Sequence, residues 1–590
     1  MDAMKDSRKR DAEKQQIPRP PPIPRGWRGR IFHSLPSYTG PYSVGTMEIE
    51  VPVREPRHFS HIKRDHDYAL RMDTVLFSIY YPTDLSYYAK HGNKPSRATW
   101  LPRPRVQTSR GYAKFLNVPH MPVTGYIAAT TMFTKLPAYR NVRLSAHRPG
   151  EQVDADAKDS QKTLTENTHE KPTFPVVVFS HGLGGSRTCY SAVCGELASN
   201  GFIVVAMEHR DGSGARSYVN VPPSSNLADG NSIDNTEPRT HYEVDYIFPK
   251  DNAQDTAPQN AKGVDTELRN AQIGMRMAEI EEAFSVLSLM NRGQGDLIAK
   301  SNLRKEGNIG SSSKGLDGVD WSDWTGRMFL ERATIMGHSF GGATSVQICR
   351  ETERFPWVGQ GILLDAWGPA TPMVNENSGK RVQRPILAIG FEAFMHWQDN
   401  FERMVEIGNE TRGNGSPCWM MTIKGSTHLS QTDFAVLYPT WMSWLGKTLV
   451  NPKRAIYLTV NSSLEFLRKT LPDDQTAGSF WPDEGILDTT PLNTHDSVPA
   501  DYRPQDKWIA ARLKIPSELR LRVMNWFRGT PKSAPKDANG KPLIGVITRA
   551  LGDEVWMHIS PSMNDTHRCN GHISRRMTRS DSALSSLANV

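Results

Sequence analysis

The sequence predicts an α/β fold in which helices cover both faces of a mostly parallel central sheet, with long loop insertions. Continuous apolar runs at 175–180 and 202–207 are typical of strands that are buried on both faces. A helical stretch at 187–200 joins them, and strands alternate with helices as far as residue 423, the order that produces parallel neighbours. A Gly-x-Ser-x-Gly segment at 337–341 lies between an apolar β-branched stretch and a run of small residues.

Length and composition limit the possible classes of protein. The chain has 590 residues, more than one compact core holds, since single cores stop growing near ~250–300 residues. A net charge of +8 permits contact with an anionic membrane. No Arg/Lys stripe or nucleic-acid-binding motif is present, so we expect no nucleic-acid partner. The five cysteines are scattered, without the spacing of a disulfide framework or a metal site, which favours a reducing compartment.

Composition divides the chain into three parts. The first is a basic, proline-rich arm that we expect to be disordered, the second is a central α/β domain, and the third is an extension that is partly helical and then disordered. Their bounds are 1–38, 39–471 and 472–590. Polar inserts interrupt the central domain near 149–172, 212–264 and 293–320. The second insert is expected to be either a lid or a disordered loop.

Other elements of the central domain follow from local patterns. Segments 47–53 and 74–81 have strand composition and are expected to pair as a hairpin at an edge of the sheet. Residues 265–292 are predicted to form an amphipathic helix, because apolar residues recur at steps of three and four. Two shorter helical patterns at 109–136 fit either a core face or an apolar surface for peripheral membrane contact.

No targeting or membrane-spanning segment is visible in the sequence. The N-terminal stretch MDAMKDSRKRDAEKQQ is charged and lacks the apolar region of a signal peptide. No run of apolar residues is long enough to cross a bilayer. We therefore expect a cytoplasmic protein that is able to associate peripherally with a membrane.

Ser339, at the centre of the Gly-x-Ser-x-Gly pattern, is the candidate nucleophile. A serine on a tight strand-to-helix turn has a strained backbone, so the residues two before and two after it must lack bulk. Gly337 and Gly341 meet that demand. The serine hydroxyl then projects above the sheet, beside the N–H groups that begin the next helix.

A serine hydroxyl needs a base, and the base needs an acid that orients it. Asp365 follows directly on an apolar stretch, which places it at the carboxyl end of the strand after the nucleophile. It is therefore the candidate acid. Glu392 and Asp399, beyond the next strand, are the alternatives.

The candidate base is His428, in the loop after the last predicted strand. His396 is the alternative, although it lies in what reads as the start of a helix. His338, beside the nucleophile, is expected to be a packing or polar neighbour, and His181 and His209 are expected to have structural roles.

Acyl transfer also requires two backbone N–H groups that hold the oxyanion. Phe340 follows the nucleophile and supplies one candidate, and Leu183, in a glycine-rich turn after an early strand, supplies the other. Loss of one such donor typically slows a reaction by ~10²–10³. Because these donors take the role that a cation would have, we expect no metal and no cofactor.

Six segments, in order, carry a resemblance to a known family. They are GPYSVG (40–45), FSHGLG (179–184), SNGFIV leading to EHRD (199–211), GHSFGGAT (337–344), LDAW (364–367) and GSTH (425–428) with Asp433-Phe434 downstream. Together they resemble the platelet-activating factor acetylhydrolases, calcium-independent phospholipases A2 of the α/β-hydrolase fold. The three inserts and the C-terminal extension depart from that pattern, and the inserts put the substrate range in doubt.

The resemblance implies a serine esterase that hydrolyses the sn-2 ester of phospholipids with short or oxidised acyl chains at a membrane or micelle surface. It carries over Ser339, Asp365 and His428 as the catalytic triad, with Leu183 and Phe340 as oxyanion donors. A general carboxylesterase or lipase is the alternative enzyme. A non-catalytic hydrolase-fold protein that binds lipid or a partner is the alternative from another class.

Overall fold

The computed structural model describes residues 33–491 with short gaps, together with 505, 508–509, 511–514 and 554–561. The gaps are 65–66, 93, 150–170, 223–239, 313, 375–379, 449, 477–478, 480 and 482. Most of the proline-rich arm, most of the insert at 149–172 and the end of the C-terminal extension therefore lie outside the described residues.

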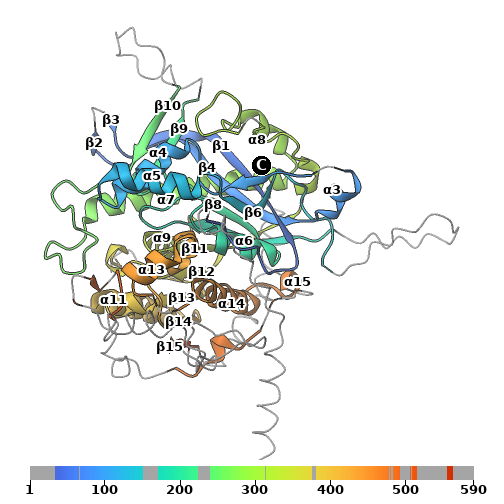
Figure 1. Cartoon of the computed structure of the whole chain (residues 1–590). Coiled ribbons are helices and arrows are strands. Elements are labelled where there is room, and N and C mark those ends of the chain that lie inside the picture. Colours follow the sequence, from blue (N-terminus) through green and yellow to red (C-terminus); the bar gives the residue numbers. More distant parts are fainter. Residues whose placement is uncertain are drawn as a thin grey trace, which may run out of the picture.

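A single large sheet organises the described part of the chain (Figure 1). Its strand order is β15-β14-β13-β12-β11-β7-β8-β4-β1-β6-β5. The six strands from β14 to β8 are parallel to one another, whereas β4 and β15 pair antiparallel with the two ends of this block. The strand bounds are β1 Ser43–His58, β4 Arg71–Thr83, β5 Arg97–Thr99, β6 Lys135–Arg140, β7 Phe174–Ser180, β8 Ile203–Met207, β11 Met328–His338, β12 Val358–Leu364, β13 Ile386–Phe391, β14 Cys418–Ile423 and β15 Val555–Ile559. The mostly parallel α/β sheet predicted from the sequence is confirmed.

Strand β7 shows why these apolar runs became central strands. Successive side chains of a strand point to opposite faces, and Val176 and Val178 belong to one core cluster while Val177 and Phe179 belong to the other. Both faces must therefore be covered by helices, and an all-apolar run is the sequence that suits such a position.

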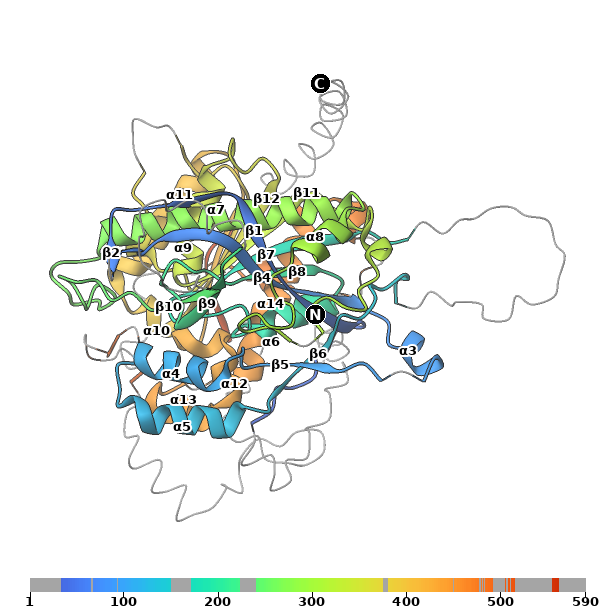
Figure 2. The ribbon, with the colours of Figure 1, turned by 90° about the horizontal axis from the view of Figure 1, so that it is seen from above.

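Helices form a layer on each face of the sheet (Figure 2). Helices α7, α9 and α11 pack on one face, and α6 and α14 pack on the other. Their bounds are α6 Ser191–Ser199, α7 Thr266–Asn291, α9 Phe340–Arg350, α11 Gln398–Gly413 and α14 Pro452–Thr470. The shorter helices are α3 Ser86–Lys90, α4 Arg105–Phe115, α5 His120–Thr131, α8 Gly295–Ser301, α10 Glu392–Met395, α12 Asp433–Leu437, α13 Pro439–Leu445 and α15 Asp473–Thr476. No helix among the described residues is both long and apolar enough to cross a membrane.

The predicted N-terminal hairpin forms, but its expected place in the sheet is wrong. Strands β1 and β4 pair antiparallel, with Ile49 opposite Phe77. They do not form an edge, because β6 pairs with the free side of β1 and β5 pairs with β6. The sequence did not indicate the edge strands, since β5 is only three residues long and β6 contains a proline.

The insert at 212–264 contains a hairpin within its described residues. Strand β9, Arg216–Asn220, pairs antiparallel with β10, His241–Asp245. The side chain of Asn220 donates to Glu50 of β1, which ties the hairpin to the main sheet. This part of the insert is therefore neither a free lid nor a disordered loop.

The C-terminal extension returns to the main sheet. Strand β15 pairs antiparallel with β14, with Met557 opposite Met421. Val555, Met557 and Ile559 are buried, while the alternate residues are partly exposed. This strand was not predicted from the sequence.

Candidate active site

Ser339 lies at the turn between β11 and α9, at the carboxyl edge of the parallel strands. Its backbone has φ 57° and ψ −118°, a left-handed conformation that a residue with a Cβ rarely adopts. The turn is held by two hydrogen bonds, from Ser339 N–H to the carbonyl of Leu364 and from Trp367 N–H to the carbonyl of Ser339. The surrounding structure thus maintains the strain that projects the hydroxyl away from the sheet.

The two glycines of the pattern are required by close contacts. A Cβ on Gly337 would lie 2.1 Å from the carbonyl oxygen of Gly341, and a Cβ on Gly341 would lie 2.1 Å from the carbonyl oxygen of Ser180. Neither oxygen can withdraw, because each belongs to the backbone. The turn therefore tolerates no side chain at either position.

The structure brings Ser339, His428 and Asp365 together from three different loops. The Ser339 Oγ lies 2.9 Å from Nε2 of His428, and the His428 Nδ1 lies 2.6 Å from Oδ2 of Asp365. Asp365 follows β12 directly and also accepts a hydrogen bond from the N–H of Phe391 on its Oδ1, at 2.7 Å. The ring of Phe394 stacks on His428 with the centroids 4.0 Å apart. The imidazole is thus held by a carboxylate at one edge and an aromatic ring on one face.

Burial acts on the protonation of both members of the His428–Asp365 pair. Loss of solvent disfavours the charged form of each group, so the pKa of Asp365 rises to about 7 and the pKa of His428 falls to about 3. The neutral imidazole that results is the form able to accept a proton from Ser339.

The alternative acids and base lie elsewhere. Glu392 and His396 form their own buried pair, with His396 Nε2 3.6 Å from Glu392 Oε1. Glu392 also accepts a hydrogen bond from the N–H of Gly425. Asp399 is exposed in the first turn of α11. None of the three has a hydrogen bond to Ser339 or His428 in the part of the chain that the structure describes.

The glycine-rich turn after β7 lies against the nucleophile. A Cβ on Gly182 would lie 2.9 Å from Cβ of Ser339, so the turn that carries Leu183 packs against the nucleophile. Within the described part of the chain, the Leu183 N–H donates to no other group. The N–H of Phe340 belongs to the first turn of α9, where helix geometry offers no acceptor. Among the described residues, neither of the N–H groups that the sequence selected has another acceptor.

A buried polar network, which was not predicted from the sequence, supports this turn. Arg276 of α7 donates from Nη1 to the carbonyl of His181 at 2.8 Å and from Nε to Asp211 Oδ2 at 2.8 Å. Its guanidinium also lies 4.5 Å from the ring centroid of Phe340. The signal in the sequence was a run of polar residues at helical spacing in α7, but an amphipathic pattern assigns such residues to the solvent side.

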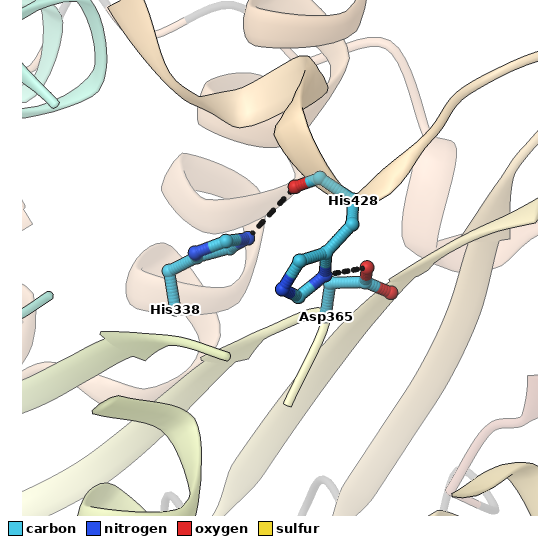
Figure 3. A group of neighbouring side chains, drawn as sticks. All are labelled: His338, Asp365 and His428. Carbon is cyan, nitrogen blue, oxygen red and sulfur yellow. Dashed lines mark hydrogen bonds and ion pairs between the residues drawn. The ribbon is translucent and has the colours of Figure 1, made fainter. Parts of the chain in front are cut away.

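His338, Asp365 and His428 are close enough together to be considered as metal ligands. Their ligand atoms lie within 4.8 Å of one another, and Figure 3 shows the three side chains around a common point. Each atom already has a partner: Asp365 contacts His428 and Phe391, and both ring nitrogens of His338 are hydrogen-bonded. Hydrogen bonding therefore accounts for the cluster, and a cation would have to displace these contacts.

A comparison with known protein families identifies the family to which the chain belongs. The model of the family described as platelet-activating factor acetylhydrolase, isoform II, matches residues 31–481. The chain belongs to this family. The match includes all three loops that meet at Ser339 and confirms the resemblance seen in the sequence.

Curated relatives share between about a quarter and a third of their residues with this chain over the matched regions. The platelet-activating factor acetylhydrolase of Gallus gallus is 31% identical over 300 residues, which cover 50% of this chain and 62% of that protein. The putative phospholipase A2 of Schizosaccharomyces pombe is 24% identical over 467 residues, or 74% of this chain and 92% of that protein. The match thus spans about three fifths of the chicken protein and nearly all of the yeast protein.

Among solved structures, a ferulic acid esterase from Streptomyces cinnamoneus matches this chain with a TM-score of 0.42 and 15% identity. The match covers 77% of this chain and 97% of the esterase chain. At that level of overlap it adds nothing to the family assignment. The sheet topology and the family together give the α/β-hydrolase fold.

Proposed function

We propose that this acetylhydrolase family member is a serine esterase that hydrolyses the sn-2 ester of phospholipids with short or oxidised acyl chains. The products are a lysophospholipid and a carboxylic acid. The observation that carries the proposal is the continuous hydrogen bonding from Ser339 Oγ through His428 to Asp365, at 2.9 and 2.6 Å. Family membership supports the choice of a phospholipid ester as substrate.

The reaction begins with nucleophilic attack by Ser339. Nε2 of His428 takes the hydroxyl proton as Oγ attacks the sn-2 carbonyl carbon. The carbonyl oxygen becomes an oxyanion, which accepts hydrogen bonds from the N–H groups of Leu183 and Phe340. His428 then donates the proton to the departing lysophospholipid oxygen, and the acyl group remains on Ser339.

Deacylation reverses the same proton transfers. A water molecule gives a proton to His428 and attacks the acyl carbon, and the tetrahedral intermediate collapses as His428 returns that proton to Ser339 Oγ. Throughout, Asp365 Oδ2 accepts the Nδ1 proton of His428, which leaves Nε2 free to exchange protons with the serine side.

The substrate approaches, in this proposal, across an apolar surface made by α4, α5 and α13, which we name the helical face. Figure 2 shows these helices beside one another, and Trp441 of α13 donates from Nε1 to Tyr126 of α5 at 2.9 Å. Large apolar side chains of the helical face are exposed: Val106, Leu116, Val118, Met121, Tyr126, Phe133, Trp441, Trp444 and Leu445. An exposed apolar patch of this kind suits insertion into the surface of a bilayer or micelle.

Residues 109–136, for which the sequence left a core face and a surface open, contain both buried and exposed apolar side chains. Tyr112 and Ile127 are buried core residues. Met121 and Phe133 are 74% and 68% exposed. The two helices are therefore both core and surface, and Phe115 of α4 packs against Gly184 in the turn beside Ser339. The face thus lies next to the reacting groups.

Hydrolysis of phosphatidylcholines with graded sn-2 chain length, measured for the wild type and for Ser339→Ala, tests the proposal. We expect rates to fall steeply as the sn-2 chain lengthens and to vanish in the variant. If the protein instead hydrolyses a soluble p-nitrophenyl ester as fast as the phosphatidylcholines, and its rate does not rise when the substrate forms micelles, it is a general carboxylesterase. Absence of any hydrolysis, together with failure of Ser339 to react with a fluorophosphonate, would indicate a non-catalytic protein.

A further inference from the structure

Both ring nitrogens of His338, the residue before the nucleophile, make hydrogen bonds that the proposed reaction does not explain. His338 is buried, its Nε2 lies 3.0 Å from the carbonyl oxygen of His428, and its Nδ1 lies 2.9 Å from the hydroxyl of Tyr190. Figure 3 shows the ring pointing from the nucleophile turn to the His428 backbone. Because a carbonyl oxygen only accepts, Nε2 carries the proton and Nδ1 must accept from Tyr190.

Tyr190 extends this contact to the turn that holds the proposed oxyanion donors. The N–H of Gly182 donates to the Tyr190 Oη at 3.2 Å, while the Tyr190 O–H donates to His338. A continuous series of hydrogen bonds therefore runs from Gly182 through Tyr190 and His338 to the backbone of His428. We call this series the Tyr190–His338 link.

We infer that Tyr190 and His338 are positioning residues, which hold the oxyanion turn and the His428 loop at a fixed separation across the nucleophile. The inference rests on the proposed function, because it concerns how the proposed base and oxyanion donors are aligned. A second connection between the two chain segments lies beyond these loops, where the N–H of Asp433 donates to the carbonyl of Cys189.

The surroundings of the link favour a positioning role over a role in packing alone. His428 begins a short 3-10 turn, His428–Gln431, and its neighbour Leu429 is 42% exposed. The hydrogen bond from His338 to the His428 carbonyl is therefore a contact from the protein interior to a loop at the surface. Burial lowers the pKa of His338 to about 3 and raises that of Tyr190, so neither group changes its donor pattern near neutral pH.

Rate and stability measurements on point variants separate positioning from packing. Tyr190→Phe removes only the hydroxyl, His338→Leu removes both ring contacts, and His338→Gln keeps an N–H able to reach the His428 carbonyl. Tyr81→Phe is the matched control, since its hydroxyl is equally buried and donates to the carbonyl of Val142 at 2.7 Å, on the far strand β4. Each variant is assayed on a phosphatidylcholine with an sn-2 acetyl chain, with active sites counted by fluorophosphonate titration.

We expect Tyr190→Phe to lower kcat about tenfold and His338→Leu about 100-fold, with KM within about twofold, because small misplacements of reacting groups slow the chemical step. His338→Gln should recover most of the loss, and Tyr81→Phe should lower Tm alone. If Tyr190→Phe has the same kcat per titrated active site as the wild type, the positioning role of the link is wrong. The proposed function would then remain intact. If His338→Leu does not fold, Tyr190→Phe decides the matter. An inactive wild type would overturn the proposed function and the link together.

Discussion

At the scale of single residues, the site depends on two backbones in unusual conformations. Ser339 has φ 57° and Asp365 has φ 42°, and both are non-glycine residues. Each directly follows a parallel strand, at the edge where chains leave the sheet. Strain of about 1–3 kcal/mol per residue persists only where the surroundings fix it, so the sheet supplies the rigidity from which the site is built.

The amide variant Asp365→Asn should reduce kcat by about 10⁴ without unfolding the protein. The Asn oxygen would still accept from the N–H of Phe391, which leaves its NH₂ group facing Nδ1 of His428. Nδ1 would then have to accept, and Nε2 would carry the proton and be unable to take another. Asp399→Asn is the control, because Asp399 is exposed and outside the cluster. Full activity of Asp365→Asn would show that Asp365 is not the acid.

The pH dependence of the reaction should reflect the buried His428–Asp365 pair. Burial raises the pKa of Asp365 to about 7, so the pair takes up a proton as the pH falls through that value, and a protonated pair cannot accept the serine proton. We expect kcat/KM on an uncharged soluble ester to fall about tenfold per pH unit on the acid side of neutrality. A profile that stays flat down to the ordinary range of a carboxylate would contradict this.

The sequence was sufficient to predict the members of this cluster, and the reason is local. Ser339 and Asp365 each follow a strand directly, and His428 lies in the loop after β14, so strand pattern and chain order place them on one edge. Tyr190 and Arg276 could not be found this way, since Tyr190 caps the start of α6, Arg276 lies within α7, and both reach the site only through packing.

At the scale of secondary-structure elements, helix α7 is unusual because it buries polar as well as apolar side chains. Its apolar residues pack on the sheet as the periodicity predicted, but the helix also buries polar residues, among them Arg269, Gln272, Arg276 and Glu279. Arg276 and Glu279 contact residues at the ends of β7 and β8, where Glu279 Oε2 lies 2.6 Å from Nδ1 of His209 and His209 Nε2 lies 2.8 Å from Ser180 Oγ. The helix therefore supports the glycine-rich turn after β7 as well as covering the core.

This arrangement predicts a pH-dependent stability that a single variant removes. Burial and the nearby Asp211 raise the pKa of Glu279 from 4.5 to about 8. A carboxyl whose pKa is raised by folding stabilises the protein fully below its unfolded pKa and loses that contribution as the pH rises through the folded pKa. Wild-type Tm should therefore fall as the pH rises from 4.5 towards about 8. Glu279→Gln, which mimics the protonated acid, should show a smaller fall in thermal denaturation scans, and parallel curves would refute the assignment.

At the scale of the whole molecule, the sheet is completed by segments that are distant in sequence. The strand order from β14 to β7 follows from the alternation of strands and helices, so this half of the sheet was predictable from the sequence. β15 was not, because it lies more than a hundred residues beyond β14 and a five-residue strand carries little signal of its own. The hairpin β9–β10 was missed for a similar reason, since it lies in a polar insert and is stabilised by contacts with β1.

The helical face gives a prediction about the whole molecule at a lipid surface. Replacing Trp441 and Trp444 together by Ala should weaken binding to phosphatidylcholine vesicles and slow hydrolysis of vesicle-borne substrate, while hydrolysis of a soluble ester stays unchanged. Each Trp is about half exposed, at 44% and 50%, so little core packing is lost. Leu297→Ala is the control, because Leu297 is 52% exposed on α8, outside the helical face.

Vesicle co-sedimentation and the two assays, run in parallel, decide between membrane contact and a structural role. A double variant that binds and hydrolyses vesicles as the wild type does would exclude the helical face as the docking surface. Equal losses on both substrates would point to damage at the active site instead.

The proposed role of Ser339 is tested by locating a fluorophosphonate adduct with mass spectrometry and measuring phospholipid hydrolysis on the same sample. We predict one adduct, on Ser339, formed in proportion to the loss of hydrolysis and slowed by a phosphatidylcholine with a short sn-2 chain. Hydrolysis that persists after Ser339 is fully modified, or an adduct on another residue that abolishes activity while Ser339 stays free, would contradict it.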